Sequence, residues 1–235
     1  MHASQEGGSG LNGGGASAGA NSASNGSPGM TGKKTATLAE RVDRRVSAKV
    51  NQKRDSWPMR LIGSASEIGD QPQMRMLCAA TIIFGVVRRD SRLAKTGVKM
   101  LAAHTLATWG KGGVKAVIDR TRPDSGDNPK VRVGNSDSHD ETSFPSGHSA
   151  GAVAVAEAFV RSYPNHAMAA RTAALAVAAV QVPRGTHYAG DVVAGVLIGL
   201  AAERASDAAA RLSVRAVDAG KIAVVDSRTE ADRKR

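Results

Sequence analysis

Long stretches of small apolar residues, each stopped by proline or glycine, constrain the fold of this chain more than any other feature. Alanine, valine and glycine recur through them without sustained strand-like alternation, apart from a brief one at 221–226. Pro164 and Pro183 end two of the stretches, because proline cannot continue a helix. The pattern predicts an all-α protein, a helical bundle of about five or six core helices. Core helices are expected at about 73–88, 91–119, 147–163, 167–182 and 189–202, with the last extending toward 219.

The two ends of the chain differ in composition from this apolar region. Residues 1–34 are rich in Gly, Ser, Ala and Asn and lack hydrophobic periodicity, which predicts a flexible, disordered tail and not a signal peptide. We then expect a basic amphipathic helix at 35–56, a helical domain at 57–220 and a charged C-terminal tail at 221–235.

Within 35–56, apolar residues recur every four positions and basic residues stand between them. The apolar set is Leu38, Val42, Val46 and Val50, and the basic set is Arg41, Arg44, Arg45 and Lys49. Two roles fit this pattern. The helix either covers the core with its other face in solvent, or binds a membrane surface or another partner.

Composition narrows the class of partner. The formal net charge of +11 favours phosphate-bearing partners of any kind. Aromatic residues make up only 3% of the chain and do not alternate with basic ones, so we expect no specific nucleic-acid binding. Cys78, the single cysteine, excludes an internal disulfide, and its apolar surroundings predict a small buried side chain. No run of about 18 apolar residues marks a clear membrane span, yet helices rich in Ala and Gly suit a bilayer as well as a soluble bundle.

The first chemical pattern is KAVIDRTRP, which places Lys115 and Arg122 seven residues apart. On a helix this spacing is close to two turns, so both side chains would leave one face. Pro123 puts Arg122 at or beyond the helix end. Two such cations clamp one phosphate dianion, Arg through paired hydrogen bonds and Lys as a point charge. A charged helix end in solvent is the plain alternative.

The second pattern, SFPSGH from Ser143 to His148, leads directly into an apolar helix. Ser146 suits the N-cap, and Gly147 lets backbone N–H groups approach a ligand, so the helix start forms an anion site. His148 then lies in the first turn, beside that anion. An ordinary capped helix with an exposed histidine is the alternative.

The third pattern places His187 four residues before Asp191 at another helix start, close enough to touch. A carboxylate bound to one ring nitrogen leaves the other nitrogen as a nucleophile or base. An acidic residue at a helix N-terminus is the alternative. Taken together, the three patterns predict phosphoryl transfer. No G-x-S-x-G elbow or phosphate-binding P-loop is present, and the loop acids at 124–141 lack zinc or EF-hand spacing, so no metal site and no cofactor are expected.

In order and spacing, these segments resemble the type 2 phosphatidic acid phosphatase superfamily, which includes bacterial acid phosphatases and vanadium haloperoxidases. The family pattern is Lys, six residues, Arg-Pro; then Pro-Ser-Gly-His; then Ser-Arg, five residues, His, three residues, Asp. Residues 115–123 and 145–148 match in full, and His187 and Asp191 match the end of the third part. The resemblance covers about residues 75–205 and makes the domain at 57–220 phosphatase-like.

One position departs from the family pattern. Gln181 stands where the family has Arg, with Val180 in place of the preceding Ser. Gln donates a hydrogen bond but carries no charge. Our hypothesis is that Arg184, three residues before His187, supplies the missing cation.

The resemblance implies that His187 attacks phosphorus and forms a phosphohistidine, that Asp191 orients it, and that His148 donates a proton and later activates water. The substrate phosphate is then bound by Lys115, Arg122, Ser146 and Gly147. We expect a phosphoric monoester hydrolase for lipid or isoprenoid phosphates that is located in a membrane, namely the bacterial inner membrane. A soluble form is the alternative location. The alternative is a helical binding protein for anionic lipid or nucleic acid that has no catalytic activity.

Overall fold

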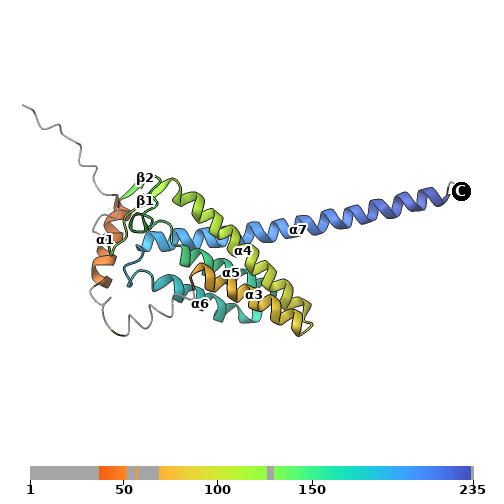
Figure 1. The fold of residues 1–235 in the computed structure, drawn as a ribbon, viewed down its shortest axis with the longest axis horizontal. Helices are drawn as coiled ribbons and strands as arrows, with labels where there is room; N and C mark the ends of the chain where they lie inside the picture. The colour runs from red at the N-terminus through yellow and green to blue at the C-terminus, as the bar shows by residue number, and fades with distance from the viewer. Residues whose placement is uncertain (1–36, 52–56, 58–68, 126–129, 234–235) are drawn as a thin grey trace, which may run out of the picture. The chain divides into compact units, whose positions relative to one another are not determined.

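The computed structural model describes residues 37–51, 57, 69–125 and 130–233 (Figure 1). The predicted N-terminal tail at 1–34 lies outside these residues. The predicted basic helix is present as α1 (Leu38–Asn51), and residues 52–56 of its expected range lie outside the described part. The described fold is the helical bundle that the sequence predicts.

Four helices of the bundle surround a fifth, which is the most buried. α5 (Gly147–Ser162) has ten buried residues and packs against α3 (Gln71–Val87), α4 (Ser91–Lys115), α6 (Ala167–Ala179) and α7 (Ala189–Arg233). Short 3₁₀ helices, η2 (His139–Glu141) and η3 (Pro164–His166), precede α5 and α6. Because most side chains on α5 are Ala, Gly, Ser or Val, neighbouring backbones come very close.

Glycines allow the close approach of α5 and α7. A Cβ atom on Gly195 would lie 2.4 Å from the carbonyl oxygen of Ser146, and one on Gly199 would lie 2.6 Å from that of Ala150. Any side chain at either position would therefore push the start of α7 away from the start of α5. This matters for function because both helix starts carry predicted site residues.

The structure corrects two expectations, one about the segment after α4 and one about residues 221–226. The helix expected over 91–119 ends at Lys115, and the chain then forms β1 (Ile118–Arg120), which pairs antiparallel with β2 (Val131–Val133). Each strand has three residues, too few for polar and apolar alternation to be visible in sequence. The alternation noted at 221–226 belongs instead to the helix α7.

The exterior of the bundle is unusually apolar. Large aliphatic or aromatic side chains are more than half exposed on α3, α6 and α7: Met76, Ile83, Phe84, Val86, Val87, Met168, Leu175, Val193 and Leu197. Within the described ranges, none of the helices combines the length and apolar character needed to cross a membrane. Cys78 is fully buried, as predicted, and burial raises the pKa of its thiol to about 11.

Candidate functional site

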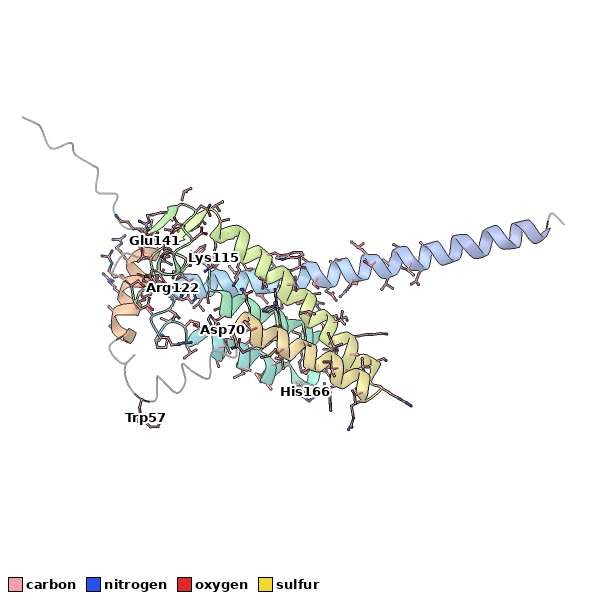
Figure 2. The ribbon with its side chains drawn as sticks, viewed as in Figure 1. Trp57, Asp70, Lys115, Arg122, Glu141 and His166 are labelled. Carbon is pink, nitrogen blue, oxygen red and sulfur yellow. The ribbon has the colours of Figure 1, made fainter. Side chains whose placement is uncertain are left out.

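A cavity of about 710 Å³ brings the three predicted motifs together. Five predicted residues line it: Lys115, Arg122, Gly147, His148 and His187. The rest of the lining comes from the start of α3, from α4 and from the loop before α7: Gly69, Asp70, Gln71, Pro72, Arg75, Lys111, Arg184 and Thr186. Figure 2 labels Asp70, Lys115 and Arg122, which come from three different elements around this cavity.

The two histidines are far apart in the sequence, yet both line the cavity. Their ring centroids are 6.4 Å apart and the ring planes meet at 67°. His148 lies in the first turn of α5, and His187 directly precedes the start of α7. Neither ring is stacked on the other, and both residues line the cavity.

His187 has a carboxylate behind it. Its Nδ1 lies 3.7 Å from Oδ2 of Asp191, an ion-pair distance that is longer than a hydrogen bond. No hydrogen-bond partner within the described residues reaches that buried nitrogen. Burial lowers the pKa of His187, although Asp191 acts in the opposite direction. The ring is therefore neutral at pH 7, and its Nε2 is the nitrogen left for the cavity.

Asp191 is fully buried and is held by groups from three segments. Its Oδ2 accepts hydrogen bonds from Ser143 Oγ at 2.5 Å and from the Tyr188 backbone N at 2.9 Å, and its Oδ1 lies 2.5 Å from Nη1 of Arg120. Burial alone would raise the pKa of Asp191, but His187, Arg120 and Ser143 hold it below its ordinary value. The carboxylate is thus kept ionised and fixed in orientation.

Arg120 extends this network to α1. Its second terminal nitrogen, Nη2, lies 2.6 Å from Oδ2 of Asp43, and its guanidinium lies 4.3 Å from the centroid of the Tyr188 ring. The Asp43 carboxylate also accepts a hydrogen bond from the Gly190 backbone N at 2.9 Å. Arg120 is 2% exposed and Asp43 5%, so a buried Asp–Arg–Asp chain joins α1 to the carboxylate behind His187.

Cations crowd the cavity. Of the described residues that line it, five are Lys or Arg, whereas Asp70 is the single carboxylate. Lys115 donates to the Thr142 carbonyl, and Arg122 Nη1 donates to the Thr186 carbonyl at 2.9 Å. Burial, with further contributions from Arg122 and Lys111, lowers the pKa of Lys115 to about 8. A bound anion would relieve this repulsion, which is what a phosphate site requires.

The predicted helix start at Ser146 and Gly147 is present, but only one of the two residues reaches the cavity. Ser146 is the N-cap, and its Oγ accepts from the Ser149 backbone N at 3.4 Å and from Ser149 Oγ at 2.9 Å. Ser146 is fully buried behind the cavity, whereas Gly147 lines it. A Cβ on Gly147 would lie 2.7 Å from Lys111 Nζ, so glycine lets that ammonium come close to the helix start.

His148 has a partner that the sequence did not reveal. Its Nε2 lies 2.6 Å from Oδ1 of Asp70, the N-cap residue of α3. Burial lowers the pKa of His148 to about 4; Asp70 raises it, while His187, Arg184 and Lys111 lower it further. Gly69 fits tightly beside this pair, since a Cβ there would lie 3.2 Å from Cδ2 of His148.

Gln181 does not take the position of a phosphate ligand. It is fully buried, its Nε2 donates to the Val177 carbonyl at 3.0 Å, and its Oε1 accepts from Thr186 Oγ1 at 3.0 Å. Arg184, in contrast, lines the cavity. The amide therefore braces the loop that carries Arg184 and His187.

The sequence analysis missed four charged residues at or behind the site: Asp43, Asp70, Lys111 and Arg120. Lys111 had a local signal, because it lies one helical turn before Lys115. The others come together only through tertiary contacts, with Asp43 and Arg120 separated by 77 positions. The structure also shows that Lys115 and Arg122 converge from a helix end and a loop after β1, not from one helix face.

Known proteins share both the motifs and the fold. Residues 96–206 match the family model described as the PAP2 superfamily. Among solved structures, the chain is similar to the transmembrane PAP2 type phosphatidylglycerolphosphate phosphatase of Bacillus subtilis, with 20% identity and a TM-score of 0.52 over 75% of this chain and 88% of that one. It is also similar to LpxE of Aquifex aeolicus, with 20% identity and a TM-score of 0.53 over 74% of this chain and 97% of that one. No curated protein sequence matches the chain significantly.

Proposed function

We propose that the chain, whose residues 96–206 match the PAP2 superfamily model, is a lipid phosphate phosphatase that works through a phosphohistidine intermediate and without a metal. One observation carries this proposal: two histidines from separate helix starts line a single cavity together with five cations. Such a cavity binds a phosphate dianion and offers it both a nucleophile and a proton donor.

In the first step, His187 Nε2 attacks phosphorus and forms the N–P bond as the bond from phosphorus to the ester oxygen breaks. Protonated His148 gives its proton to that oxygen, so the alcohol leaves neutral. Lys115 and Arg122 balance the charge on the equatorial oxygens, and Arg184 takes the role of the Arg missing at position 181. Asp191 stabilises the positive charge that forms on the His187 ring.

In the second step, His148 is neutral and takes a proton from a water molecule as that water attacks phosphorus. The N–P bond breaks, inorganic phosphate is released, and His187 returns to its neutral form. The two imidazoles thus need different protonation states in the resting complex. In the empty cavity burial keeps both neutral, and the dianion of the substrate restores the proton on His148 by raising its pKa.

A hydrocarbon chain on the substrate fits the surroundings of the cavity. A second, apolar cavity of about 330 Å³ lies between α3, α5 and α6, with Met74, Phe159 and Val177 in its wall. Gly69 lies where the two cavities come close together, because a Cβ there would contact both Val177 and His148. We place the lipid or isoprenoid chain in this apolar cavity and the phosphate in the charged one.

The apolar exterior supports a membrane location for the protein, because exposed patches of this kind mark membrane or protein contacts. The Bacillus subtilis neighbour is itself named as a transmembrane phosphatase of a phosphatidyl substrate. A membrane-associated enzyme meets lipid phosphates where they reside.

Trapping the intermediate tests the mechanism. Rapid quenching with a ³²P-labelled aryl phosphate should give a protein-bound phosphoryl group that is stable to alkali and labile to acid. His187→Ala should give none. His148→Ala should accumulate it, because an aryl oxide leaves without a proton donor whereas hydrolysis of the intermediate still needs a base.

His166→Ala is the matched control, since His166 is exposed and does not line the cavity (Figure 2). It should turn over like the unaltered chain. Phosphate release should persist in EDTA, and vanadate should inhibit. Absence of turnover with lipid, isoprenoid and aryl phosphates alike would favour the non-catalytic binding protein instead, and loss of the labelled group on chelation would contradict a metal-free reaction.

A further inference from the structure

Helix α1 turns its polar side inward and its aliphatic side outward. Asp43 and Ser47 are the side chains it buries, each 5% exposed. Leu38 is 72% exposed and Val42 is 48% exposed, one turn apart. A helix that only covered a core would do the reverse. Asp43 therefore attaches α1 to the rest of the protein through its contacts with Arg120 and with the Gly190 backbone N.

The outward face of α1 is also strongly basic. Arg41, Arg44, Arg45 and Lys49 are all exposed. The acidic residue in the first turn, Glu40, is half-buried and tied to Thr37, whose backbone N donates to its Oε2 at 2.8 Å. Leu38, Arg41, Val42, Arg45 and Lys49 recur at spacings of one helical turn, so aliphatic and cationic groups occupy one face. We call these five residues the outward face of α1.

We propose that the outward face of α1 binds the surface of an anionic lipid bilayer. Phosphate head groups neutralise the Arg and Lys side chains, and Leu38 and Val42 enter the boundary between head groups and acyl chains. Nucleic acid satisfies the cations equally well but leaves both aliphatic side chains in water. The combination of charges and aliphatic groups thus selects a lipid surface.

The tryptophans give an independent sign of this environment. The chain has two, and both are largely exposed, Trp57 by 74% and Trp109 by 69%. Tryptophan is usually well buried in soluble proteins, and it is enriched at membrane–water interfaces. Trp57 follows α1 closely in sequence and points away from the ribbon in Figure 2. Its fluorescence therefore reports contact of this region with a bilayer.

Attachment through Asp43 connects the lipid-binding face to the catalytic region. The chain of contacts Asp43–Arg120–Asp191 holds α1 firmly against the structure behind His187. A bilayer bound to α1 would lie at a fixed position relative to the cavity. The proposal itself does not depend on the phosphatase activity, because lipid binding is measured without turnover.

The test is binding of the full chain to vesicles. The protein should cosediment with vesicles of phosphatidylglycerol and phosphatidylcholine, and its tryptophan emission should shift to shorter wavelength. Vesicles of pure phosphatidylcholine should have neither effect. Added salt should weaken binding to the mixed vesicles. Arg41→Gln with Arg45→Gln should lower the partition coefficient about 10- to 30-fold, the effect of losing about 1 kcal/mol for each of two cations.

Arg211→Gln with Arg215→Gln is the matched control, because it removes two exposed arginines at the same spacing from α7. It should leave binding within about twofold. His187→Ala should bind like the unaltered chain, which separates this surface from the catalytic cavity. Equal losses for both arginine pairs, equal binding to neutral vesicles, or release of the vesicle-bound protein by duplex DNA would each overturn the proposal.

Discussion

Removing the Arg120 guanidinium should both destabilise the protein and slow its chemistry. Arg120 is 2% exposed and contacts two buried carboxylates, Asp43 at 2.6 Å and Asp191 at 2.5 Å. Arg120→Gln removes the cation that both of these carboxylates contact. Breaking a buried pair in this way costs about 3–5 kcal/mol in the free energy of unfolding.

A substitution of Asp43, the partner of Arg120 on α1, should reduce the stability less. Asp43→Asn keeps one oxygen, which can accept from Arg120 or from the Gly190 backbone N but not from both, because these donors bind different oxygens of Asp43; the Arg120–Asp191 contact stays intact. The expected loss is about 1–3 kcal/mol, the cost of one hydrogen bond whose partner is left unsatisfied. In the double variant Arg120→Gln with Asp43→Asn, one of the two carboxylates that lost the Arg120 cation is no longer present. The losses in the free energy of unfolding should therefore be non-additive by about 1–3 kcal/mol.

Urea unfolding of the four proteins measures these free energies, and hydrolysis of an aryl phosphate measures function. Because Arg120 does not line the cavity, Arg120→Gln should lower kcat with little change in KM. Its removal also lets burial raise the pKa of Asp191, which weakens support for the positive charge on His187. Additive free energies, or an Arg120→Gln protein as stable as the unaltered one, would refute the buried-network reasoning.

Three further predictions follow from single contacts. Asp70→Asn should move the descending limb of kcat/KM to lower pH, because burial already lowers the pKa of His148 to about 4 and loss of Asp70 lowers it further, so the proton donor is lost earlier. Lys115→Arg should abolish a rise in KM above about pH 8, since the Lys115 pKa is about 8 and Arg stays charged. Gly195→Ala should destabilise the protein by about 1–3 kcal/mol, whereas Gly112→Ala, with no neighbour within 4 Å, should stabilise it by about 0.5–1 kcal/mol.

Controls keep these predictions specific. Asp137→Asn alters an exposed carboxylate that lies outside the cavity, so the pH profile should not move. An identical shift in both Asp variants would point to general electrostatics and not to the contact with His148. An alkaline limb in KM that survives Lys115→Arg would assign that limb to another group.

The helical bundle could be predicted from the sequence because the features that indicate it lie within short segments. Prolines at 164 and 183 stop helices, and runs of Ala and Val without alternation allow no long strand. The candidate site residues Lys115, Arg122, His148, His187 and Asp191 were predicted the same way, from spacing and from residue types placed at helix ends. Burial of Cys78 also followed from its apolar neighbours.

Contacts between segments that are distant in the sequence could not be predicted from the spacing of residues. Nothing near Arg120 in the sequence indicates that it is buried between two carboxylates, one of which lies 77 positions away. Asp70 became a partner of His148 for the same reason, because the start of α3 packs against the first turn of α5. The two short strands form because the chain folds back on itself at 118–133. Segments of three residues are too short for their sequence to predict this pairing.

Residue identity told us which groups could hold and transfer a phosphate, since charge, hydrogen-bonding capacity and helix-end position are properties of short segments. Burial, countercharge and orientation are properties of several segments at once, and they set which imidazole is neutral, which carboxylate stays ionised and which face of α1 meets solvent. The candidate residues could therefore be identified from the sequence, whereas the electrostatics around them arose only when the helices packed.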